Sequence, residues 1–346
     1  MNLEERIESF AKLGRTLKEV LNGGLGSYGE QLISLINNQQ SHNPWFTPEN
    51  VKMAITAIAN ELTEDNLIKW TNAYPELKSK KDPVRAGLIM AGNIPLVGFH
   101  DFLSVLISGN NVIAKTSSKD PELIILISEM LCAINKKFRG KIAFTEGTLT
   151  NFDIVIATGS NNSSRYFEYY FSKYPNIIRK NRNSIAIIDG NETSAEVENL
   201  GTDIFSYFGL GCRNISKIFI PKEYDISKLI TRWFSFSDII NNIKYANNYD
   251  FNKAVYLVNK ESFHDTGYLL IKEDSRISSP VSVLFYEVYE SQSVLKHQLE
   301  LNKDNIQCIA GRQYLPFGQT QSPRMWEYAD GIDTIEFLLK NNCRNL

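Results

Sequence analysis

The chain has 346 residues, of which 43% are hydrophobic, so it can form one large or two ordinary domains with a substantial core. Its 37 Lys and Arg against 39 Asp and Glu residues leave a formal net charge of -2, which argues against nucleic-acid binding, because that function needs a clustered positive excess. The four cysteines lack the spacing of a zinc site or a redox motif, the N-terminus is acidic where a signal peptide is basic, and the longest apolar stretch is interrupted by polar residues. We expect a cytoplasmic protein with no membrane span, disulfide framework or bound metal.

The first eighty residues are predicted to be helical. Residues 3–21 place their large apolar side chains on one helical stripe, and Thr47 and Thr63 stand where N-caps would open two further helices. The glycines of residues 24–29 have the spacing of a dinucleotide-binding loop, but that loop follows a strand, whereas here a helix precedes it. We expect these glycines to form an ordinary interhelical loop.

A different pattern begins at Val84, where short apolar runs alternate with helical stretches. This alternation is typical of βαβ units and a mostly parallel sheet. The predicted helices cover residues 96–107, 121–136 and 161–172, and the predicted strands are the runs AGLIMA, NVIAK, KIAFTE, DIVIATG and SIAIID.

The alternation resumes after Asn191. Residues 198–209 are predicted to form a helix, and the runs SKIFIPK, KAVYLVN and VSVLFYEV to form strands. The fold class is therefore α/β with two lobes, and we place the boundary near Gly190, between domains of residues 1–189 and 190–346.

Asn93 follows the predicted strand GLIM in the segment Ala91-Gly92-Asn93-Ile94-Pro95. An asparagine at the carboxyl end of a strand can direct its side-chain N–H groups into the crevice where α/β proteins bind ligands. The alternative is that the segment is only a turn.

Lys115 ends the apolar strand NVIAK and is followed by Thr116, Ser117 and Ser118. An ammonium group at that point suits an anion or a hydroxyl group at the sheet edge, and the hydroxyl run can cap the helix predicted to begin near Pro121. A lysine that extends to solvent beside a capped helix explains the pattern equally well.

Cys212 lies in the segment Gly209-Leu210-Gly211-Cys212-Arg213-Asn214, between a predicted helix and the strand SKIFI. The glycines allow close backbone approach, the Cys212 N–H can point at an oxyanion, and a neighbouring arginine favours the thiolate. Alternatively, the cysteine is a small buried apolar residue.

In order and spacing, the Asn93, Lys115 and Cys212 segments together with Thr158-Gly159-Ser160 resemble the aldehyde dehydrogenase superfamily. The C-terminal segment RQYLPFGQTQSPRMWEYADGIDTIEFL narrows the resemblance. With it, residues 84–340 resemble the LuxC-type acyl-CoA reductase family, whose best-known members supply fatty aldehyde for bacterial luminescence.

The resemblance implies an aldehyde dehydrogenase-like fold, with a Rossmann-type cofactor domain and an α/β catalytic domain. It makes Cys212 the nucleophile and Asn93 an oxyanion donor. Residues implied to contact the cofactor are Lys115, Ser117, Ser118, Thr158, Gly159 and Ser160. Ser118 stands where NAD-preferring members carry an acid, so NADPH is the expected cofactor. The implied substrate is an acyl-CoA or acyl-carrier protein thioester, with a partner acyltransferase or synthetase and a homo-oligomer as further expectations.

Two positions depart from the superfamily pattern. Arg179 stands where hydrolytic members carry a glutamate base, which fits acyl transfer to a thiol rather than to water. Arg276 stands where a second glutamate holds the nicotinamide ribose. Three functions therefore stay open: an acyl-thioester reductase, an acyl shuttle that keeps Cys212 without reducing anything, and a non-catalytic partner subunit.

Overall fold

A computed structural model describes residues 1–24, 26, 28–79 and 82–342. Leu25 and Ser27 of the glycine-rich segment lie outside the described residues. The chain divides into two compact units, one formed by residues 1–180 and 324–346 and the other by residues 181–323. Each unit is described by itself.

The N-terminal segment of the first unit is helical, as predicted. Its helices are α1 (Leu3–Leu21), α2 (Gly29–His42), α3 (Pro48–Glu61) and α4 (Glu64–Thr71). Thr47 accepts a hydrogen bond from the N–H of Asn50 and Thr63 from that of Asn66, so both predicted N-caps are confirmed. Fully buried Phe10, Leu13 and Leu17 on the stripe of α1 join the core of this unit.

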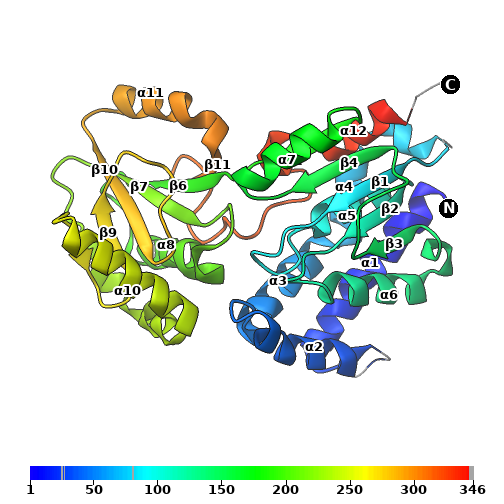
Figure 1. The fold of residues 1–346 in the computed structure, drawn as a ribbon, viewed down its shortest axis with the longest axis horizontal. Coiled ribbons are helices and arrows are strands. Elements are labelled where there is room, and N and C mark those ends of the chain that lie inside the picture. The colour runs from blue at the N-terminus through cyan, green and yellow to red at the C-terminus, as the bar shows by residue number, and fades with distance from the viewer. Residues whose placement is uncertain (25, 27, 80–81, 343–346) are drawn as a thin grey trace. The chain divides into compact units, whose positions relative to one another are not determined.

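The first unit contains a five-stranded parallel sheet in the order β3-β2-β1-β4-β5. The strands are β1 (Arg85–Ile89), β2 (Asn111–Lys115), β3 (Ile142–Thr145), β4 (Ile154–Thr158) and β5 (Asn176–Arg179). Connecting helices are α5 (Phe99–Ile107), α6 (Leu123–Ile134) and α7 (Asn161–Phe171). In Figure 1, α6 and α7 lie on opposite sides of the sheet. The predicted βαβ organisation is confirmed.

The second unit is built on a six-stranded sheet in the order β11-β6-β7-β10-β9-β8, parallel except for the β8–β9 pair. The strands are β6 (Asn183–Ile187), β7 (Ile215–Pro221), β8 (His264–Asp265), β9 (Leu270–Glu273), β10 (Val283–Tyr289) and β11 (Ile306–Ala310). Its helices are α8 (Ser194–Phe205), α9 (Ser227–Arg232), α10 (Ile243–Val258) and α11 (Gln292–Asn302). Figure 1 shows α11 on one face of the sheet and α8 and α10 on the other.

The strand predicted for the run KAVYLVN is wrong, because these residues belong to the last turns of α10 and the segment after it. The helix buries Tyr245, Tyr249, Asn252 and Tyr256, which recur every three or four residues on one face. The apolar run alone does not distinguish a helix from a strand, and the tertiary contacts of this face decide between them.

The C-terminal segment returns to the first unit, where α12 (Thr334–Asn341) packs against α5. Tyr328 accepts a hydrogen bond from the indole of Trp70 at 2.8 Å, and Tyr74 donates to Asp333 at 2.6 Å. The contacts therefore divide the chain after residue 180 and again after residue 323, whereas the sequence placed one boundary at residue 189. A single linear boundary cannot represent a segment that is distant in sequence and packed into the first core.

None of the helices in the described part of the chain has the length and the apolar run that a bilayer crossing needs.

Candidate active site

Three of the segments predicted to carry function lie at one edge of the first sheet. Strand β1 pairs in parallel with β2 on one side and with β4 on the other, and Ile89 is in register with both Lys115 and Ala157. The loops that carry Asn93, Ser118 and Ser160 therefore follow three adjacent strands at their carboxyl ends. This is the edge at which parallel α/β sheets bind ligands.

The loop that carries Asn93 is fixed by residues on either side of it. A β-carbon on Gly92 would stand 2.5 Å from the hydroxyl oxygen of Ser117, so only glycine fits at this contact. Leu96 is buried and has a left-handed backbone with φ of 60°, and its N–H donates to the Asp120 carboxylate at 2.8 Å. Asn93 itself is exposed. The loop is thus held in place through Gly92 and Leu96.

Asp120 joins this loop to the loop after β2. Its carboxylate accepts from the backbone N–H of Leu96 in the Asn93 loop. The capping predicted for the serine and threonine hydroxyl groups is wrong, because Glu122 is the residue before α6 and no side chain makes a cap hydrogen bond there. Burial raises the pKa of Asp120 to about 6.

The residues predicted to contact the cofactor after β2 differ in exposure. The Ser117 hydroxyl accepts from the Lys119 N–H at 3.2 Å and packs on Gly92, so it shapes the turn. Ser118 and Lys119 are exposed, and Lys115 is half-buried. Lys115 makes no ion pair with any carboxylate of the described residues, which leaves its charge available to a ligand anion or hydroxyl group.

Thr158 ends β4, and Ser160 is the N-cap of α7, where its side chain accepts from the N–H of Ser163. Gly159 is required for packing, because a β-carbon there would lie 2.8 Å from the Phe167 ring. The N-terminal N–H groups of a helix favour anions. A phosphate-bearing cofactor therefore fits the residues present at this edge.

The helical N-terminus braces the same edge, which sequence reasoning did not predict. Asn43 is 3% exposed, and its amide donates to the backbone oxygen of Lys119 at 3.3 Å. The fully buried Gln39 donates to the Glu122 carboxylate at 2.8 Å. Both contacts end on the turn that leads into α6, so α2 supports the loop that carries Ser118.

Cys212 lies in the second unit, at the corner of a tight turn between α8 and β7. The N–H of Asn214 donates to the backbone oxygen of Gly211 at 3.0 Å, which makes Cys212 and Arg213 the central residues of a β-turn. The Ser184 hydroxyl donates to the backbone oxygen of Cys212 at 3.0 Å. Cys212 is exposed, so the alternative of a buried apolar residue is wrong.

The first part of the segment that narrowed the family resemblance, residues 312–323, belongs to the same unit as Cys212 and is hydrogen-bonded to α8. Asp203 is fully buried and accepts from the N–H groups of Gly318 at 2.6 Å and Thr320 at 3.0 Å. The backbone oxygen of Asp203 also accepts from the Asn214 side chain at 3.0 Å. The end of α8 therefore contacts both the cysteine turn and the C-terminal part of this unit.

Arg179, at the position of the missing glutamate base, is buried in an ion pair. Its guanidinium donates to both Asp101 oxygens, at 2.6 and 3.0 Å, to Thr334 at 2.9 Å and to the backbone oxygen of Ala329 at 2.7 Å. Burial opposes ionisation of Asp101, but the Arg179 charge outweighs it and holds the pKa of this carboxyl below its usual value. Arg179 thus fastens the C-terminal segment to β5.

Arg276, at the position of the second glutamate, is engaged with an acid. Its guanidinium donates to both oxygens of Asp274, at 2.6 and 2.8 Å, and lies 5.0 Å from the centre of the Phe285 ring. Lys272 also donates to Asp274 at 2.8 Å. Hydrogen bonding to Asp274 raises the pKa of Arg276. The Asp274 carboxylate is therefore shared between Arg276 and Lys272.

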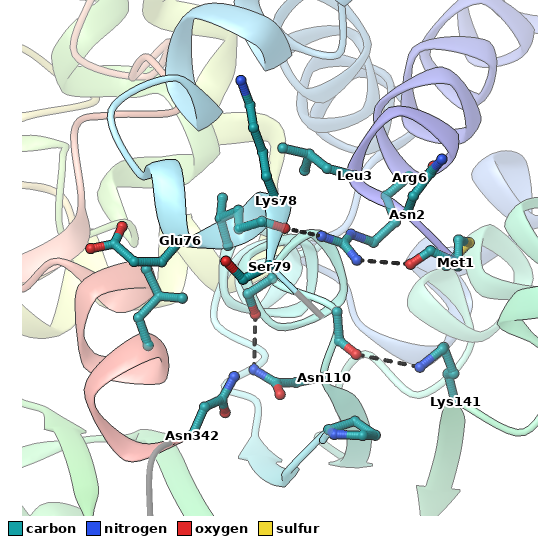
Figure 2. A pocket seen from close by; sticks show the side chains of 15 residues that line it. Met1, Asn2, Leu3, Arg6, Glu76, Lys78, Ser79, Asn110, Lys141 and Asn342 are labelled. Carbon is teal, nitrogen blue, oxygen red and sulfur yellow. Dashed lines mark hydrogen bonds between the residues drawn. The ribbon is translucent and has the colours of Figure 1, made fainter. Parts of the chain in front are cut away.

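A cavity of about 340 Å³ lies at the opposite edge of the first sheet, before strands β1, β2 and β3 (Figure 2). Arg6 and Lys141 line it, and both donate hydrogen bonds to backbone oxygens of the protein. Arg6 donates to the backbone oxygens of Met1 and Leu77, and Lys141 to that of Gly109. This cavity is separate from the edge that carries Asn93 and Lys115. Among the described residues there is no cluster of three or more His, Cys, Asp or Glu that could hold a metal ion.

Comparison with known proteins identifies the family. The Acyl-CoA reductase (LuxC) family model matches residues 36–279, which is more than half of the chain. A long-chain acyl-protein thioester reductase of Photorhabdus laumondii is 24% identical over 211 residues, or 56% of this chain. The match spans only 42% of the length of that relative.

Solved structures show the fold. Aldehyde dehydrogenase 21 of Physcomitrella patens, in complex with succinate, has a TM-score of 0.69 at 12% identity and covers 99% of this chain and 84% of its own. A Mycobacterium tuberculosis aldehyde dehydrogenase complexed with NAD+ has a TM-score of 0.63 at 14% identity, covering 86% and 71%. The predicted aldehyde dehydrogenase-like fold is confirmed, and the chain belongs to the LuxC acyl-CoA reductase family.

Proposed function

We propose that the protein is an acyl-thioester reductase in which Cys212 forms the acyl-enzyme. The observation that carries the proposal is the exposed position of Cys212 at the corner of a turn held at both ends. The Cys212 thiolate forms a bond to the acyl carbon of an acyl-CoA or acyl-carrier protein thioester, and the bond to the carrier sulfur breaks. The carrier thiolate leaves and takes a proton from water. The thioester is already electrophilic, so this step needs no metal.

The oxyanion of the tetrahedral intermediate needs donors fixed in advance. The proposal assigns this role to the side-chain amide of Asn93 and the backbone N–H of Cys212. It is supported by the way in which Gly92, Leu96 and Asp120 fix the Asn93 loop. A preorganised donor stabilises the transition state without a reorganisation cost at the moment of reaction.

We assign cofactor binding to the first unit and the nucleophile to the second. Lys115 would bind ribose hydroxyl groups, Ser117 and Ser118 would shape and line the adenosine end, and Thr158, Gly159 and Ser160 would present the N-terminus of α7 to the pyrophosphate. When bound, the reduced nicotinamide supplies the hydride that releases the acyl group as an aldehyde. NADPH is the proposed cofactor because exposed Ser118 and Lys119 offer no negative charge to its 2′-phosphate.

Ser118→Glu tests this choice of cofactor. The introduced carboxylate would repel a 2′-phosphate and accept from a 2′-hydroxyl group, so we expect the ratio of kcat/KM for NADPH over NADH to fall by about tenfold or more, equal to about 1.4 kcal/mol. Ser118→Gln is the matched control, since it has the same size without the charge. An unchanged ratio in the Glu variant would mean that the 2′ position is recognised elsewhere.

Water is a poor acceptor for the proposed acyl-enzyme. A base that activates water is worth roughly 10²–10⁴ in rate. Arg179 cannot act as one, because a guanidinium stays protonated and this one is committed to Asp101. Mixing the protein with acyl-CoA alone should release one equivalent of CoA in a burst, followed by a very slow phase. Adding NADPH should then produce aldehyde.

The same experiment separates the competing functions. Sustained rapid release of CoA without cofactor would indicate a thioesterase. A burst followed by no aldehyde with NADPH would indicate an acyl shuttle, which the pairing of Arg276 with Asp274 favours. Absence of any burst would leave the role of a non-catalytic subunit.

The compartment and partners belong to the same proposal. An exposed thiol nucleophile persists in a reducing compartment, which favours the cytoplasm. A partner acyltransferase or synthetase would supply or exchange the acyl group, and a homo-oligomer is compatible with this chemistry.

A further inference from the structure

The turn that carries Cys212 is closed by two hydrogen bonds between the same two residues. The N–H of Asn214 donates to the oxygen of Gly211 at 3.0 Å, and the N–H of Gly211 donates to the side-chain oxygen of Asn214 at 2.8 Å. Both bonds join the residues that flank the central pair Cys212 and Arg213. The backbone of Cys212 is therefore fixed from both ends of the turn.

Asn214 is itself fixed by the end of α8. It is 2% exposed, and its amide nitrogen donates to the backbone oxygens of Asp203 at 3.0 Å and Ser206 at 2.8 Å. A buried amide with all its hydrogen bonds made has one orientation, because rotating it would leave buried polar groups unpaired. Asn214 thus links the end of α8 to the N–H of Gly211 by hydrogen bonds, and so fixes where that N–H lies.

The chain before the turn is strained. Tyr207 and Phe208 are buried and have left-handed backbones, with φ of 51° and 58°, and Gly209 follows with φ of 74°. Left-handed geometry is unfavourable for residues other than glycine and persists only where surrounding contacts impose it. Asn214 supplies such contacts, because it bonds Ser206 on one side of the strained residues and Gly211 on the other.

We propose that Asn214 is a positioning residue for the acyl-transfer reaction, and that its side-chain oxygen, through the N–H of Gly211, sets the orientation of the Cys212 backbone toward the oxyanion. The inference rests on the proposed function, in which the Cys212 N–H donates to the tetrahedral intermediate. The side chain of Asn214 makes its hydrogen bonds to backbone groups and not to the Cys212 thiol, so we expect its effect only in steps that form an oxyanion.

Two reactions of the Cys212 thiol distinguish the loss of a positioned oxyanion donor from a general disturbance of the structure around the thiol. Acylation by acyl-CoA passes through an oxyanion, whereas alkylation by iodoacetamide displaces iodide at carbon and forms none. Both depend on the fraction of thiolate. The ratio of the acylation rate to the alkylation rate, followed at Cys212 by peptide mass spectrometry, therefore cancels any change in thiol pKa.

In Asn214→Ala we expect this ratio to fall by about ten- to a hundredfold, because misplacing an oxyanion donor forfeits part of the roughly 10²–10³ that one donor is worth. Asn252→Ala is the control. Asn252 is also buried in the second unit and also donates to two backbone oxygens, of Asn248 and Val281. Its replacement should lower Tm without changing the ratio.

Asn214→Asp keeps an oxygen that can accept from Gly211. Burial among backbone oxygens should keep the introduced carboxyl protonated at pH 6, so that it still donates once. We expect its ratio at pH 6 to lie within about threefold of wild type, although Tm falls. This variant tests the proposal even if Asn214→Ala fails to fold.

The outcomes are distinct. A ratio in Asn214→Ala within threefold of wild type overturns the positioning role, as does an equal loss of acylation and alkylation. A loss in Asn214→Asp as large as in the Ala variant also overturns it. If the wild-type protein is not acylated at all, the proposed function fails first and the inference falls with it.

Discussion

Cys212→Ser is expected to abolish labelling of the protein by radioactive acyl-CoA while leaving its Tm within a few degrees of wild type. A cysteine offers a few per cent of thiolate at neutral pH, whereas a serine hydroxyl is not a nucleophile unless a base activates it. Cys212 is exposed, so the substitution removes little buried surface. Labelling is measured on the denatured protein, and persistent labelling of the variant would rule out Cys212 as the nucleophile.

The other cysteines provide controls for this experiment. Cys132 and Cys308 are half-buried, and burial raises the pKa of Cys132, which lowers its thiolate population. The sulfur of Cys308 lies 3.0 Å from the Ser184 hydroxyl. Replacing either with alanine should leave acyl labelling intact. Cys343, for which we expect the same result, lies outside the described residues.

Asn93→Ala should slow acylation by roughly 10²–10³, the amount by which the loss of one oxyanion donor slows a reaction. The close packing at Gly92 and the bond from Leu96 to Asp120 remain in the variant, so we expect them to preserve the shape of the loop. The measurement is the single-turnover rate of CoA release at saturating acyl-CoA.

Asn72→Ala is the matched control for Asn93, since Asn72 is an exposed asparagine at the end of α4 in the same unit. It should acylate at the wild-type rate with an unchanged Tm. An effect of Asn93→Ala smaller than about tenfold would return Asn93 to the role of a turn residue.

The sequence by itself determined those structural features that depend only on residues close together in the chain. The N-caps Thr47 and Thr63, the alternation of strands and helices after Val84 and the position of Lys115 at a strand end all depend on neighbouring residues. The sequence also located the candidate chemistry, because a polar residue that directly follows an apolar strand is displayed at the edge of the sheet.

Only the tertiary structure decided the features that join distant residues. The run KAVYLVN is helical because α10 buries one face, and residues 324–342 belong to the first unit because Arg179 and Asp101 bind Thr334 there. The bond from the Leu96 N–H to Asp120 and the bonds that join Asn214 to Gly211 and to the end of α8 likewise depend on contacts that no local pattern records. Buried polar groups must find partners wherever the fold places them, and those partners can lie more than a hundred residues away in the sequence.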